Sequence, residues 1–86
     1  MRKQQDWFVY ILQCSDQTLY TGVTTDPERR VEEHNSGIKG AKYTAARRPV
    51  KLVYCEQLDS RSTAQQREHQ IKSLTRTQKQ QLIKNK

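Results

Sequence analysis

The sequence has little of what marks exported, membrane or zinc-binding proteins. Its 86 residues include two cysteines, three glycines and two prolines, and no apolar run approaches the ~20 residues of a transmembrane helix. No signal-peptide pattern follows the basic start, so we expect a cytoplasmic chain without a membrane partner. Cys14 and Cys55 have no Cys or His at metal-ligand spacing, which excludes a zinc site and favours two reduced, structural thiols.

Acidic side chains are also scarce. Nine Asp and Glu residues stand against 16 Lys and Arg, giving a formal net charge of +7. The excess lies in residues 42–86, which hold eleven basic and three acidic side chains. Such a surface attracts polyanions, because neutralising phosphates releases condensed counterions. Nucleic acid is therefore the expected partner, and a merely soluble basic surface is the alternative.

The chain is expected to form one domain over residues 1–86, since no repeat or linker interrupts it. Residues 7–12 and 19–24 are rich in β-branched and aromatic side chains and predict two strands of a hairpin. Residues 52–55 predict a third strand. With a three-residue turn in the hairpin, even-numbered positions of its two strands share one face. The pattern therefore places Tyr10, Tyr20 and Gly22 together.

Capping signals predict three helices. Asp26 and Pro27 are typical of the start of a helix that runs to about His34. A second helix is expected over roughly residues 62–74, beginning from Ser60 or Ser62, and a short third helix over about 78–84.

Two further features point to function. Residues 36–49 lack a clear period and predict a long surface loop with a short helical turn, and loops of that length in small domains are usually functional or disordered. Glu68 lies between Ala64 and Ile71 on the inward stripe of the second predicted helix. A carboxylate there is costly unless it is paired or binds a metal.

These residues form an ordered set along the chain. The set comprises two tyrosine strands, an Arg-x-x-x-His helix and a glutamate helix: Phe8-Val9-Tyr10, Tyr20-Thr21-Gly22, Arg30, His34 and Glu68. It resembles the GIY-YIG nuclease domain, particularly its small bacterial single-domain members, over about residues 6 to 84. The resemblance implies an α+β fold, a small three-stranded antiparallel sheet flanked by helices. It also implies cleavage of phosphodiesters with one divalent metal ion, Mg²⁺ or Mn²⁺.

The resemblance assigns catalytic positions to Tyr10, Tyr20, Arg30, His34 and Glu68, with Glu68 as the metal ligand. The residue types suit that chemistry. A single carboxylate can hold a hard cation whose other ligands are waters and phosphate oxygens. A guanidinium matches phosphate geometry and stabilises accumulating negative charge. One tyrosine would accept the proton of the attacking water and the other would position the water or phosphate; the sequence leaves open which.

The chain departs from the family pattern at two positions. Phe8 replaces the first glycine of the motif, and Val23 stands where some relatives have lysine. A phenol with an ordinary pKa of about 10 is a poor base at neutral pH unless positive charge favours its phenolate. The sequence therefore suggests Arg30, the metal and His34 as sources of that charge, with His34 or Lys42 replacing the missing lysine.

Basic and aromatic side chains would form the nucleic-acid surface, with Gly22 allowing a close backbone approach. The candidates are Gly22, Lys39, Lys42, Tyr43, Arg47 and Arg48, together with Arg76, Lys79, Lys84 and Lys86 near the C-terminus. Tyr43 would stack on an unpaired base. No predicted helix has Asn, Gln and Arg at the spacing of a helix that reads DNA bases. This favours an enzyme that selects DNA structure or single strands over one that selects a base sequence.

Taken together, the sequence predicts a metal-dependent DNA endonuclease. The alternative is a nucleic-acid-binding module on the same fold with little or no catalysis, and a purely structural protein is the third hypothesis. The sequence leaves open whether RNA is also a substrate, which protein partner the chain has, and its oligomeric state.

Overall fold

The computed structural model describes residues 6–37 and 39–85, so Lys86 and the first five residues lie outside the described part. Three strands and four helices follow one another along the chain. They are β1 (Trp7–Gln13), β2 (Leu19–Thr24), α1 (Pro27–Ser36), α2 (Lys42–Ala45), β3 (Lys51–Leu58), α3 (Arg61–Lys72) and α4 (Arg76–Lys84). The strands form an antiparallel sheet in the order β2-β1-β3. The predicted α+β fold is confirmed.

The β1–β2 hairpin has the register that a three-residue turn dictates. The backbone N–H of Cys14 donates to the carbonyl of Thr18 at 2.8 Å, and Gln17 takes the left-handed conformation (φ 72°) common at the end of such turns. Tyr10 consequently pairs with Gly22, and Leu12 with Tyr20. Directly paired residues project to the same face, so the prediction that the two tyrosines share a face is confirmed.

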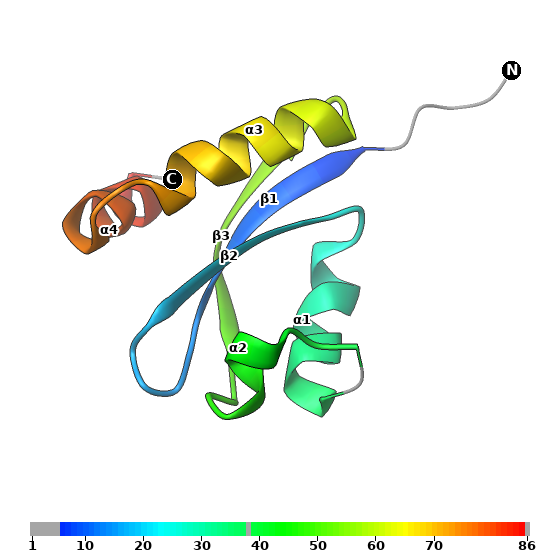
Figure 1. Cartoon of the computed structure of the whole chain (residues 1–86), viewed down its shortest axis with the longest axis vertical. Helices are drawn as coiled ribbons and strands as arrows, with labels where there is room; N and C mark the ends of the chain where they lie inside the picture. The colour runs from blue at the N-terminus through cyan, green and yellow to red at the C-terminus, as the bar shows by residue number, and fades with distance from the viewer. Residues whose placement is uncertain (1–5, 38, 86) are drawn as a thin grey trace, which may run out of the picture.

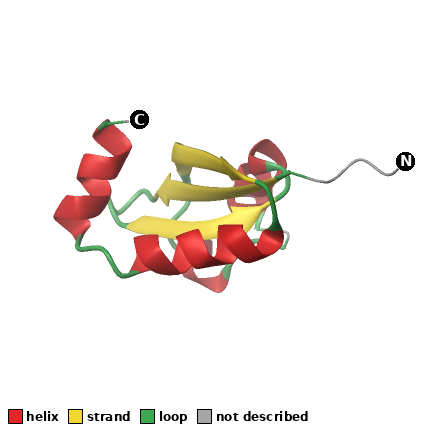
Figure 2. Cartoon of the chain, turned by 90° about the horizontal axis from the view of Figure 1, so that it is seen from above, coloured by secondary structure: helices red, strands yellow, loops and turns green. Residues whose placement is uncertain are grey.

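In Figure 1 the strands run between α3 and α4 at the top and α1 and α2 at the bottom, and the sheet has an apolar layer on each side. The odd-numbered residues Val9 and Ile11 pack with Tyr54 of β3 and Ile71 of α3, and α4 adds to this layer. The even-numbered residues form a second cluster of Tyr10, Leu12, Cys14 and Val50 beneath α1. Figure 2 shows α3 alongside the sheet and α4 beyond its end. No helix in the described residues has the length and apolar character needed to span a membrane.

The helix boundaries follow their caps. The Asp26 carboxylate accepts from the N–H of Arg29 at 3.2 Å, and Gly37 ends α1 in the left-handed conformation (φ 82°), two residues beyond the predicted end. Thr75 caps α4, so that helix begins two residues earlier than predicted. The third strand extends over eight residues instead of four. β3 is longer because it pairs with β1 along the whole length of β1. The added residues are too polar for the sequence alone to predict a strand there.

Candidate functional site

The buried part of the site is a hydrogen-bonded chain from β1 through α1 to α2. Tyr10 Oη lies 3.0 Å from His34 Nε2, and the two residues are 1% and 0% exposed. Thr44 Oγ1 lies 2.8 Å from His34 Nδ1 and donates its own proton to the carbonyl of Ala41. The backbone N–H of Ala41 also donates to Nδ1, at 3.4 Å. Both ring nitrogens of His34 therefore have hydrogen-bond partners, one on β1 and the others at the start of α2 and within it.

Burial fixes the charge states of both members of the Tyr10–His34 pair. Desolvation, with a smaller contribution from the positive charge of Arg30, lowers the pKa of His34 to about 4. Desolvation raises the pKa of Tyr10 to about 12, and a hydrogen bond and the charge of Arg30 only partly oppose that rise. At neutral pH the histidine is uncharged and the phenol keeps its proton. The suggestion that His34 supplies positive charge was therefore wrong.

The neutral, buried His34 predicts a loss of stability in acid. The unfolded chain takes up this proton below pH 6.5, whereas the folded chain does so only near pH 4. Stability should therefore fall as pH falls through that window, by up to about 3 kcal/mol from this residue. Urea unfolding at pH 7 and pH 4 should show a smaller difference for His34→Gln than for wild type. The control His69→Gln, at an exposed position of α3, should keep the wild-type difference; identical behaviour of both variants would contradict the assignment.

Tyr20 is the more accessible phenol of the site. Its ring centre lies 6.5 Å from that of Tyr10 and 5.3 Å from that of His34. Tyr20 is half-buried, whereas Tyr10 is enclosed. A substrate can therefore approach the second tyrosine of the motif, while the first lies beneath it.

Tyr43 of α2 stacks on Tyr20, with ring centres 5.8 Å apart and planes at 26°. The guanidinium carbon of Arg47 lies 4.1 Å from the centre of the Tyr43 ring, and Asp16 of the hairpin turn holds Arg47 through a 3.0 Å bond. Tyr43 was predicted to stack on an unpaired base. In the structure its ring packs against Tyr20 and Arg47 while the residue is 38% exposed, so base stacking stays a prediction and Tyr43 also supports Tyr20.

Gly22 makes room for Tyr10. A Cβ at position 22 would lie 2.6 Å from Tyr10 Oη, far inside van der Waals contact, and the buried phenol is held by His34 and cannot swing away. Gly22 is itself buried. Gly22 therefore lies beneath the site and not on the outer surface. Its lack of a side chain allows Tyr10, the first tyrosine of the motif, to contact His34.

Arg30 reaches the site from α1 and is held by its own helix. Its Nη1 donates to Glu33 Oε1 at 3.0 Å and to the carbonyl of Lys39. Its side chain is 23% exposed, against 59% for Arg29, which also contacts Glu33. Sequence analysis missed the role of Glu33. The three-residue spacing from Arg30 was the available signal, because residues so spaced are neighbours on a helix surface.

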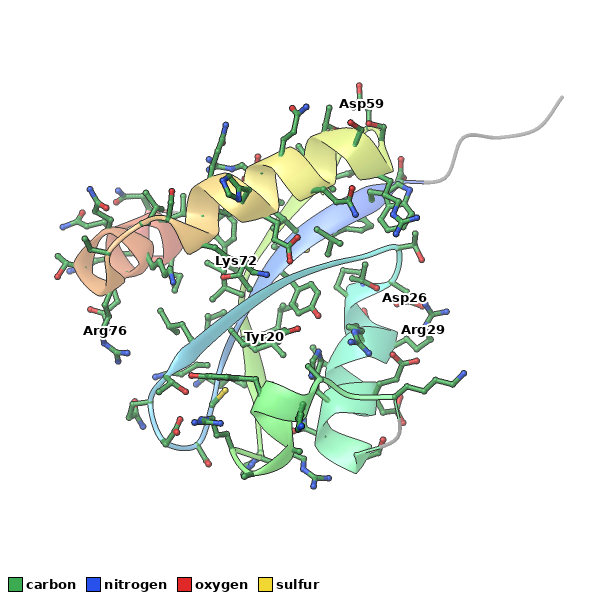
Figure 3. All side chains as sticks on the ribbon, viewed as in Figure 1. Tyr20, Asp26, Arg29, Asp59, Lys72 and Arg76 are labelled. Atoms are coloured by element: carbon green, nitrogen blue, oxygen red, sulfur yellow. The ribbon has the colours of Figure 1, made fainter. Side chains whose placement is uncertain are left out.

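Glu68 lies on the opposite helix but approaches the same phenol. Its charge acts on Tyr10 in the direction that raises the pKa. The carboxylate is 21% exposed and pairs with Lys72 Nζ at 3.0 Å; Figure 3 shows Lys72 on the side of α3 that faces β2. Glu68 is therefore paired, one of the two conditions under which a carboxylate at this position is tolerated, and it remains partly open to solvent.

The donor set suits a hard cation with few protein ligands. Within residues 6–37 and 39–85 no group of three His, Cys, Asp or Glu side chains is placed to enclose a metal. Glu68 offers one carboxylate that is partly open to solvent, which could hold a divalent ion whose other ligands were waters and phosphate oxygens. Mg²⁺ sites that share the ion with a substrate phosphate have this composition. The residues present fit such an ion.

The predicted basic surface divides into two groups. Lys39 and Lys42 are exposed beside α2. The two arginines have internal partners instead: Arg47 Nη1 donates to the carbonyl of Tyr43 at 2.8 Å, and Arg48 Nε to that of Ala45 at 3.0 Å. Arg47 and Arg48 therefore stabilise the α2 segment, which in turn holds Thr44 and Tyr43 against the site.

Comparison with known proteins agrees with this arrangement. The family model described as "GIY-YIG catalytic domain" matches residues 6–81. A UPF0213 protein of Natronomonas pharaonis is 59% identical over 78 residues, 91% of each chain. A UPF0213 protein of Haloquadratum walsbyi is 64% identical over 75 residues, 87% of this chain and 83% of the relative.

Two solution NMR structures are also similar. A protein of E. faecalis is 47% identical, with a TM-score of 0.64 over 99% of this chain and 90% of that one. A UPF0213 protein of Bacillus halodurans is 46% identical, with a TM-score of 0.61 over 94% and 85% of the two chains.

Proposed function

The chain belongs to the GIY-YIG nuclease family, and from that premise we propose that it is a metal-dependent endonuclease hydrolysing phosphodiester bonds in DNA. The observation that supports the proposal is that Arg30 and Glu68, on helices at opposite sides of the sheet, are both near enough to Tyr10 to influence its pKa. On this proposal Arg30 is the phosphate-binding fork and Glu68 the metal-ligating carboxylate of one site.

Arg30 binds the phosphate that is cut. Its guanidinium is permanently charged and planar, and Glu33 and the Lys39 carbonyl hold it from one side. A cation fixed in this way stabilises the charge that accumulates on the phosphoryl oxygens without having to reorganise. Glu68 holds Mg²⁺ or Mn²⁺, which when bound polarises the phosphate and stabilises the leaving oxygen.

The two tyrosines divide the remaining work. Tyr10 is enclosed, and burial raises its pKa to about 12, so its phenol keeps its proton at neutral pH and is not the group that accepts the proton of water. Its hydrogen bond to neutral His34 fixes the ring that packs beside Tyr20. Tyr20 is the phenol that solvent reaches, and we assign it the contact with the attacking water and its proton.

We assign to Lys72 the role of the lysine that some relatives have at position 23. His34 and Lys42 were the candidates from the sequence. Lys42 and Lys72 are both exposed, but Lys72 Nζ lies 3.0 Å from the Glu68 carboxylate. A divalent ion on Glu68 would compete with Lys72 for that carboxylate. The freed ammonium would then be available to a substrate phosphate at the same site.

The substrate is proposed to be single-stranded or branched DNA. The sequence predicts no base-reading helix, and the nine-residue α4 is basic and glutamine-rich. Recognition would therefore rest on phosphates and on strand geometry, as expected for selectivity without a recognition sequence.

Cleavage of labelled single-stranded, duplex and branched DNA, with Mg²⁺ or Mn²⁺ and with EDTA, tests the proposal. We expect product only with the divalent ion, and a rate about 10²- to 10⁴-fold lower for Tyr20→Phe, because proton transfer typically contributes that much. Tyr54→Phe is the matched control: Tyr54 lies on the other face of the sheet and donates to Glu56. Salt-sensitive binding without product would favour the alternative, a binding module.

A further inference from the structure

A second hollow adjoins the proposed active site at the start of β2. It measures about 230 Å³ and lies between the hairpin, α2 and α4. Its lining combines two basic side chains with an aromatic ring and the beginning of the strand: Thr18, Leu19, Tyr43, Arg76 and Lys79. None of these residues except Tyr43 belongs to the proposed active site, and the Tyr43 ring forms one wall of the hollow.

The two cations of this hollow are held in place by the fold. Arg76 Nη2 donates to the carbonyl of Gln17 in the hairpin turn at 2.6 Å, and Figure 3 shows Arg76 pointing from α4 toward that turn. Lys79, one helical turn later, is half-buried. The hydrogen bond of Arg76 goes to a neutral carbonyl, so its charge is not cancelled there. Asp16, the acid of the same turn, is engaged by Arg47.

The hollow and the active site are neighbours on an edge strand. Leu19 lines the hollow and the next residue, Tyr20, belongs to the active site. Tyr43 joins the two, because it lines the hollow and stacks on Tyr20. β2 pairs with β1 on one side only. Leu19 and Tyr20 project to opposite faces of β2, so a nucleic-acid strand lying along the open edge of β2 would contact both the hollow and the active site.

We propose that this hollow is a phosphate-binding subsite for the substrate strand, next to the phosphate that is cut. The inference rests on the proposed function and deepens it, because it gives the strand a path along β2 and two charged contacts outside the catalytic set. It also gives the basic residues different roles, since Arg47 and Arg48 support α2, whereas Arg76 and Lys79 bind the backbone of the nucleic acid.

The salt dependence of binding tests this subsite without any catalysis. Each phosphate neutralised on a single strand contributes about 0.7 to the slope of log K against log salt. The probe is a fluorescein-labelled 12-nucleotide dT strand in EDTA, and anisotropy gives Kd from 50 to 300 mM KCl. Arg76→Gln/Lys79→Gln should lower the slope by about 1.4 relative to wild type, and Lys79→Gln alone by about 0.7.

The matched control removes two charges elsewhere. Lys51 and Arg61 are exposed and lie outside the hollow, so Lys51→Gln/Arg61→Gln should leave the slope near the wild-type value. Equal changes in the two double variants, or no change in Lys79→Gln, would overturn the subsite. The single variant Lys79→Gln separates the loss of a phosphate contact from a loss of folding, because it leaves the Arg76–Gln17 hydrogen bond intact. A protein that showed the expected slopes but never cleaved DNA would refute the proposed function and leave the subsite standing.

Discussion

Glu68→Gln is expected to reduce divalent-ion-dependent cleavage by at least ~10³-fold. The amide has the size of the carboxylate but carries no charge, so it cannot hold a hard cation, and the stabilisation of several kcal/mol that a metal gives a phosphoryl transition state would be lost. The fold should survive, because Glu68 is partly exposed and forms its ion pair with an exposed lysine, Lys72. Single-turnover cleavage at saturating Mn²⁺ measures the loss, and circular dichroism checks the fold.

The control for Glu68 is an acid on the other side of the sheet. Glu32 is exposed on α1, and Glu32→Gln removes the same charge from the molecule. This Glu32→Gln variant should cleave DNA at the wild-type rate. Wild-type cleavage by Glu68→Gln would place the metal elsewhere. Equal losses in both variants would mean that net charge, and not a metal ligand, had been measured.

Arg30→Lys is expected to lower the rate about 10²- to 10³-fold, which is typical of removing one fixed donor to developing negative charge. Lysine keeps the charge but loses the planar fork that contacts Glu33, the Lys39 carbonyl and a phosphate together. Because the lost contact strengthens in the transition state, kcat should fall more than KM rises. Cleavage rates over a range of substrate concentrations separate the two effects.

The adjoining arginine provides the control for Arg30. Arg29 lies one residue earlier, contacts the same Glu33 at 3.7 Å and is 59% exposed. Arg29→Lys should leave kcat and KM unchanged, since its side chain is turned to solvent. If the two substitutions reduced kcat equally, Arg30 would act through Glu33 and the stability of α1. A direct contact with the phosphate would then be excluded.

The elements of the fold and the register of the hairpin were predictable because local signals decide them. The alternation around Tyr10 and Tyr20 assigns their face, and the three-residue turn fixes which residues pair. Asp26 and Gly37 delimit α1 through bonds to backbone groups a few residues away. The extent of β3 was less predictable, because its outer half is held by pairing with β1 and not by its own composition.

The sequence by itself determined that two tyrosines, an arginine, a histidine and a glutamate occur in the order of one family. Only the tertiary structure decided their chemical states. His34 is neutral because burial removes it from water. Tyr43 packs against Arg47 from the end of α2, and Lys72 is the cation that pairs with Glu68. Charge state and accessibility depend on desolvation and on neighbours from other elements, and local sequence encodes neither.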